Sequence, residues 1–149
     1  MMRTAVLTLV FLVFLGGSAA WAAQEWIQVV MWDGREVTLG DFGFYESFTW
    51  DHMTDYRVHR GEIPVAYYGA VTEFSLKQIA SIQNSAPSFA EHFHGLTIEL
   101  VDGTRFASAG LPEITGVIGR DTIGEIRIPG RMIRSIKFLR PTEQEKAEK

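Results

Sequence analysis

The chain has 149 residues, which suits one domain or two very small ones, and carries a formal net charge of −4. It contains no cysteine, which excludes a disulfide framework, a thiolate metal site and a cysteine nucleophile. The acidic balance argues against a nucleic-acid binder, which normally carries a basic footprint.

Residues 1–22 have the organisation of a secretory signal peptide. Arg3 supplies a positive charge, an apolar run covers residues 5–15, and Ala20-Trp21-Ala22 forms an A-x-A cleavage site. The run is shorter than the roughly 20 residues that a membrane-spanning helix needs, although an uncleaved anchor is the alternative. We therefore predict a periplasmic or secreted protein that begins near Ala23 and has no transmembrane segment after cleavage.

Two stretches, residues 27–34 and 96–103, share an alternating apolar pattern that ends in Asp-Gly. An Asp-Gly pair between alternating runs predicts a β-hairpin with a type I′ turn, in which both central residues have positive φ. Later segments at 74–82 and 128–136 also match each other, and in the same order. The ordered matches predict an internal duplication.

The repeated unit reads as strand, turn, strand, variable middle, strand, tight turn and strand. It resembles the small β-barrels of the SH3-like and Sm type, a resemblance that brings no catalytic residue with it. We predict an all-β fold in which two such modules pack together, with a single β-sandwich as the alternative. The expected strands cover residues 26–32, 35–40, 64–74, 79–83, 95–101, 104–108, 113–119, 123–129 and 133–139.

The first unit is expected over residues 23–84 and the second over 95–140. A linker over 85–94 joins them, and a polar tail follows over 141–149. The first unit has the longer middle, which contains an insert at 42–68. Its only helix candidate begins after Ser75, which could act as an N-cap. The matching segment of the second unit carries Pro129 and Gly130, so no more than a short helical turn is expected.

The insert is rich in aromatic residues. Exposed aromatic rings offer stacking faces for sugars and rigid anchors at protein interfaces. The alternative is core packing, expected above all for Phe42, Phe44 and Phe48. The candidate partner-binding residues of the insert are Tyr45, Trp50, Tyr56 and Tyr67.

Charge is distributed unevenly along the chain. Residues 120–140 hold six basic and two acidic side chains, whereas residues 23–119 hold five basic and thirteen acidic ones. A basic edge could contact an anionic polymer, lipid headgroups, an acidic partner, or the acidic half of a second copy. Alternatively, these charges protect edge strands from aggregation. The candidate contacts are Arg127, Arg131 and Arg134.

Four histidines are candidate metal ligands. His52 and His59 lie in the insert, and His92 and His94, two residues apart, would share one face of a strand. Imidazoles together with a carboxylate can hold Zn²⁺ or Cu²⁺. Surface histidines without metal are the alternative, since no spacing matches an established motif such as H-E-x-x-H.

The sequence contains no G-x-S-x-G elbow and no glycine-rich nucleotide loop. A carboxylate pair for hydrolysis would first involve Asp51, Asp55 or Glu62. We therefore predict a non-catalytic exported module that binds an envelope protein or polymer through the insert and the basic stretch. A histidine-based metal-binding protein is the alternative, and a small hydrolase of an envelope polymer is a weaker one.

Overall fold

The computed structural model describes residues 25–87 and 93–140. In these residues the regular structure is antiparallel β-strand, apart from two short 3₁₀ turns, and the all-β prediction is confirmed. The strands join in one large sheet that is not closed, so the expected closure into small barrels is not observed. The expected signal peptide, His92 and polar tail lie outside the described residues.

Outside the insert the strand bounds agree with the expected ones to within three residues, and the insert forms additional strands. The expected strand over 64–74 is two strands joined at Tyr68-Gly69, and the short turn expected after Ser75 is present. In chain order the elements are β1 (Trp26–Met31), β2 (Glu36–Trp50), β3 (Met53–His59), β4 (Glu62–Tyr67), β5 (Ala70–Ser75), η2 (Leu76–Gln78), β6 (Ile79–Asn84), β7 (Phe93–Leu100), β8 (Arg105–Leu111), β9 (Gly116–Arg120), β10 (Glu125–Pro129), η3 (Gly130–Met132) and β11 (Ile133–Leu139).

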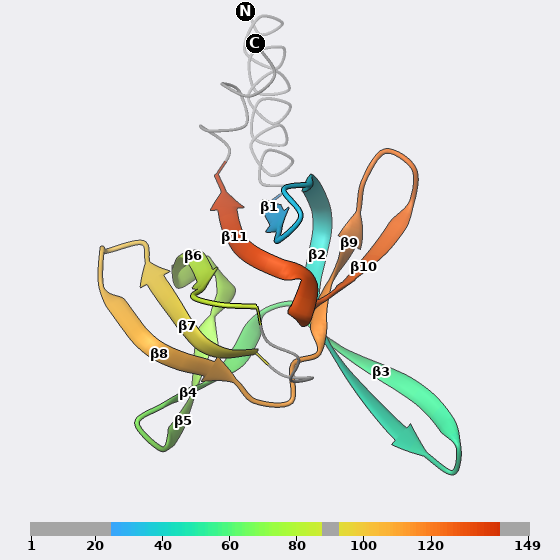
Figure 1. Ribbon diagram of the computed structural model, residues 1–149, viewed down its shortest axis with the longest axis horizontal. Coiled ribbons are helices and arrows are strands. Elements are labelled where there is room, and N and C mark those ends of the chain that lie inside the picture. The colour runs from blue at the N-terminus through green and yellow to red at the C-terminus, as the bar shows by residue number, and fades with distance from the viewer. Residues whose placement is uncertain (1–24, 88–92, 141–149) are drawn as a thin grey trace, which may run out of the picture. The chain divides into compact units, whose positions relative to one another are not determined.

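The order of strands in the sheet is β10-β9-β2-β1-β11-β6-β7-β8-β4-β5, and β3 pairs with β2 (Figure 1). The order has a two-fold symmetry, in which each strand of one half of the list has a counterpart in the other half. The strands β1, β2, β4, β5 and β6 correspond in turn to β7, β8, β9, β10 and β11. Each half of the sheet therefore combines two strands from one part of the chain with three from the other. Strand β3 has no counterpart in this symmetry.

The pairing register repeats in the same way. Val29 of β1 lies opposite Ile136 of β11, and the corresponding Ile98 of β7 lies opposite Ile82 of β6. At the centre of the sheet Ile82 and Ile136 lie opposite each other. These are the residues that the sequence matches had aligned, so the matched segments occupy equivalent places in the sheet.

The two Asp-Gly turns share one geometry, but not the type I′ turn that we predicted. Gly34 and Gly103 have φ of 88° and 89°, whereas Asp33 and Asp102 are not in the positive region. The N–H of each glycine donates to the carbonyl three residues earlier, at 3.0 Å in both turns. Each turn is therefore a three-residue loop that closes on a left-handed glycine.

The two aspartates explain why only the glycines have positive φ. The Asp33 carboxylate accepts a hydrogen bond from the backbone N–H of Arg35 at 3.0 Å, and Asp102 accepts one from Thr104 at 2.8 Å. A hydrogen bond from the side chain of an aspartate to the backbone N–H two residues later forms an Asx-turn. In both turns the aspartate keeps a negative φ. The same backbone N–H groups lower the pKa of both carboxyl groups.

The described strands share one hydrophobic core. Alternate residues of β1, beginning with Ile27 and Val29, are fully buried, as the two-residue period of a strand with one covered face requires. Their cluster includes Leu39 from the first half of the chain and Ile98 and Ile136 from the second. The two halves of the chain therefore form a single core and not two.

Candidate functional site

Residues 46–57 of the aromatic insert form the outer part of a long β-hairpin. Strand β2 pairs with β3 from Phe44 to Trp50, but with β9 no further than Tyr45. In the described sheet, residues 46–50 therefore pair only with residues 53–57. This part of the hairpin projects beyond the rest of the sheet (Figure 1). The ribbon has no covering layer from the described residues toward its tip, where the side chains from Phe48 to Arg57 are exposed.

The tip of this hairpin is a two-residue turn. Trp50 and Met53 are the last pair of the ladder, and between them Asp51 and His52 have φ of 48° and 64°. Positive φ at both central residues is the pattern of a type I′ turn. This turn has no glycine, so the sequence carries no Asn-Gly or Asp-Gly signal for the hairpin. Aspartate and histidine are among the residues that tolerate left-handed backbone best.

Replacing His52 with glycine is expected to raise the free energy of unfolding by about 0.5–1 kcal/mol, because glycine adopts left-handed φ without a Cβ clash. Chemical denaturation of the wild type and the variant measures the change. Thr54→Gly is the matched control, since that residue has no positive φ, and it is expected to lower stability. Equal effects at the two positions would contradict the turn assignment.

The outer end of one face of the projecting hairpin is mostly apolar, although Asp55 lies opposite Phe48 on that face. Because successive strand residues alternate between faces, Phe48 and Trp50 share a face with Met53, which lies opposite Trp50. Their exposed fractions are 41%, 78% and 73%. Phe42 and Phe44 are buried as the core alternative expected, whereas Phe48 is exposed because it lies beyond the last residue that pairs with β9.

The opposite face joins the insert to the basic stretch. The ring of Tyr56 packs edge-on against Tyr45, with 5.9 Å between centroids, and the Arg127 guanidinium lies 4.3 Å from the centre of the Tyr56 ring. Tyr56 is 43% exposed, whereas Tyr45 beneath it is 5% exposed. Burial raises the pKa of Tyr45 above the ordinary value of a tyrosine. Tyr45 therefore supports the exposed pair formed by Tyr56 and Arg127.

A glycine makes room for this stack. A Cβ placed on Gly116 of β9 would lie 2.8 Å from the Tyr45 ring and would also overlap the carbonyl oxygen of Ile128. The bare backbone of Gly116 lets the Tyr45 ring lie across the strand pair formed by β9 and β10. This packing brings Arg127, on β10, within reach of Tyr56.

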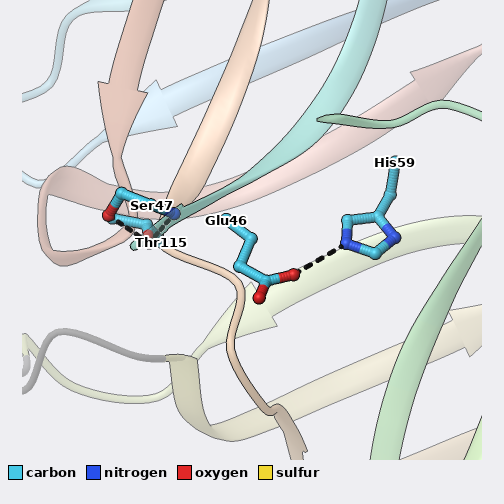
Figure 2. A network of polar contacts seen from close by, with 4 residues as sticks. All are labelled: Glu46, Ser47, His59 and Thr115. Carbon is cyan, nitrogen blue, oxygen red and sulfur yellow. Dashed lines mark hydrogen bonds and ion pairs between the residues drawn. The ribbon is translucent and has the colours of Figure 1, made fainter. Parts of the chain in front are cut away.

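Polar contacts anchor the base of the hairpin on both faces (Figure 2). On one face Glu46 Oε2 lies 3.2 Å from Nε2 of His59, with both side chains largely buried. On the other, the Ser47 N–H donates to the Thr115 hydroxyl at 3.0 Å, and the two hydroxyls lie 2.9 Å apart. Because Thr115 immediately precedes β9, these bonds connect the ribbon to the sheet.

The remaining candidate contacts lie in different surroundings. Tyr67 packs against Tyr68 and Phe106, with centroid distances of 4.5 and 5.1 Å, at the end of the β4–β5 hairpin. The charge of Arg131, in η3, partly opposes the rise in the pKa of Tyr45. Arg134 is exposed on β11, whose paired neighbours are β1 and β6. Arg127 is thus the basic residue that contacts the aromatic hairpin directly.

The candidate metal ligands are separated along the strands. His52 lies at the tip and His59 at the base of β3, seven residues away, or roughly 20 Å in an extended strand. His94 is exposed on β7. In residues 25–87 and 93–140, no three His, Cys, Asp or Glu side chains lie close enough to hold one metal ion.

The carboxylates considered for hydrolysis are all exposed. Asp51 is in the tip turn, Asp55 is in β3 and Glu62 begins β4. The Asp55 carboxylate accepts a hydrogen bond from the N–H of Tyr56 at 2.8 Å.

Two members of the exposed surface, Phe48 and Met53, are not among the residues predicted from sequence to bind a partner. Core packing was the alternative expected for Phe48, and Met53 is not aromatic. The strand alternation on either side of Asp51-His52 carries the signal, because it places Met53 opposite Trp50 and on the same face as Phe48.

In the part of the chain that the structure describes, no helix is long and apolar enough to cross a membrane. Comparison with known proteins finds no matching family model, no matching curated protein and no matching solved structure.

Proposed function

We propose that the chain is an exported, non-catalytic periplasmic module that binds an envelope protein or polymer through the hairpin of residues 46–57. The organisation of residues 1–22 supports export. The exposed apolar cluster of Phe48, Trp50 and Met53 supports binding and carries the proposal. Aromatic side chains and methionine are enriched at protein interfaces, and a contiguous exposed apolar patch is typical of an interaction site.

The hairpin suits a binding role for a second reason. Arg127 extends over Tyr56, so the second face combines an aromatic ring with a positive charge. Arginine and tyrosine are two of the residues that most often dominate binding energy. A partner with both apolar and anionic groups would match the two faces of the hairpin.

Replacing Trp50 and Tyr56 together with alanine is expected to weaken partner binding at least tenfold, because each truncation removes an aromatic anchor. The measurement is retention of solubilised envelope proteins, and of isolated cell-wall polymer, on the immobilised chain. Circular dichroism checks that the variant folds.

The β4–β5 hairpin provides a matched control. Tyr68 and Val71 are also exposed there, and their double alanine variant is expected to retain the partner. Undiminished binding by the folded Trp50 and Tyr56 variant would remove the hairpin from the interface.

We also propose that the chain is an internal duplication of one SH3-like set of strands, in which the last three strands are exchanged between copies. The five strands β11-β1-β2-β9-β10 follow one another in the same order as β6-β7-β8-β4-β5. Two equivalent backbone hydrogen bonds support this. The Trp32 N–H donates to the Met132 carbonyl at 3.0 Å, and in the other copy the Val101 N–H donates to the Gln78 carbonyl at 2.8 Å.

A further inference from the structure

Strand β3 has a free backbone edge, since β2 is its only paired neighbour among the described strands. Trp50 and Met53 close a two-residue turn, and such a closing pair exchanges both backbone hydrogen bonds. Hydrogen-bonded and non-hydrogen-bonded residues alternate along an antiparallel strand. The backbone N–H and carbonyl groups of Thr54, Tyr56 and Val58 are therefore directed away from β2. In the single chain the N–H of Tyr56 accordingly donates to the Asp55 carboxylate at 2.8 Å and not to β2, and pairing with another strand would replace this bond.

The sequence of this edge is complementary to itself. If two copies of β3 lie antiparallel with Tyr56 opposite Tyr56, Asp55 of each copy faces Arg57 of the other, and Thr54 faces Val58. The outward-directed groups at 54, 56 and 58 then form hydrogen-bonded pairs. Opposite charges that face each other across strands stabilise the pairing.

We infer that the free edge of β3 pairs with the same edge of a second copy, so that two hairpins form a four-stranded antiparallel sheet. The contact is isologous, as expected for a two-fold dimer. It uses the backbone edge and the charges of Asp55 and Arg57, and it does not depend on the function proposed for the aromatic faces.

The same charges select one register. Sliding the second strand by two residues in one direction places Asp55 opposite Asp55, and sliding it in the other direction places Arg57 opposite Arg57. Like charges directly opposite each other are unfavourable. Within each hairpin Arg57 already lies opposite Glu46, so the dimer would carry rows in which acidic and basic side chains alternate across the strands.

Sedimentation of the purified protein over a range of concentrations tests this pairing. The wild type is expected to show a monomer–dimer equilibrium. Asp55→Lys alone and Arg57→Glu alone are each expected to weaken association about tenfold, because two attractive contacts become repulsive. Mixing the two variants is expected to restore the dimer, since every substituted position then faces a side chain of opposite charge.

A backbone substitution provides an independent test. Thr54→Pro removes a donor that points away from β2, so it is expected to abolish the dimer and preserve the hairpin. Thr54→Val keeps the donor and is expected to dimerise like the wild type. Restored association in the charge mixture also demonstrates that both variants fold. A wild type that remains monomeric at every concentration, or a dimer that neither Asp55→Lys nor Thr54→Pro weakens, overturns the inference.

Discussion

Replacing Phe44 with alanine is expected to lower the free energy of unfolding by about 3–5 kcal/mol. Its side chain is fully buried, and its ring stacks on that of Phe138 with 6.4 Å between centroids. Truncation removes these contacts and leaves a cavity that the surrounding strands fill only in part. Since small domains are stable by about 5–15 kcal/mol, the loss would be a large share of the total. Chemical denaturation measures it.

Trp50→Ala is the matched control for this experiment. Trp50 lies on the same strand, six residues further on, but its side chain is 78% exposed. Its truncation is expected to change stability by no more than about 0.5 kcal/mol. A cost below about 1 kcal/mol at Phe44, or a comparable cost at both positions, would contradict the division of β2 into a core part and a projecting part.

Replacing Gly116 with alanine is expected to lower the free energy of unfolding by about 1–3 kcal/mol, through overpacking. The added Cβ would overlap the Ile128 carbonyl oxygen, a backbone atom that cannot move independently, and would press on the Tyr45 ring. Because Tyr45 supports Tyr56, the variant is also expected to change the near-ultraviolet circular dichroism of the aromatic side chains.

Gly61→Ala distinguishes this clash from a general effect of replacing glycine. Gly61 precedes β4, has no positive φ, and a Cβ there would meet nothing within 4 Å. Its replacement is expected to be neutral or to stabilise the fold by up to about 1 kcal/mol, through the unfolded chain. If both alanine variants unfold at the same denaturant concentration, the packing assigned to Gly116 is wrong.

The candidate surface was only partly predictable from sequence. Trp50 and Tyr56 were identified from composition, and both are exposed. Tyr45 was placed in the same group but is buried beneath Tyr56, because Gly116 leaves space for its ring. Tyr56 and Arg127 are 71 positions apart in the chain. Their contact cannot be predicted from a local sequence pattern.

Local features of the sequence determined the all-β class, most strand positions, the two Asp-Gly turns and the equivalence of residues 27–34 and 96–103. Such features depend on interactions between neighbouring residues, namely the two-residue alternation of a strand and the preference of glycine for positive φ in a turn. Tertiary structure alone decided that β1 pairs with β11 and β7 with β6, so that each half of the sheet contains strands from both halves of the chain. Every half-buried strand has the same alternation, so the pattern does not specify a partner. The choice depends on which apolar faces can be buried together in one core.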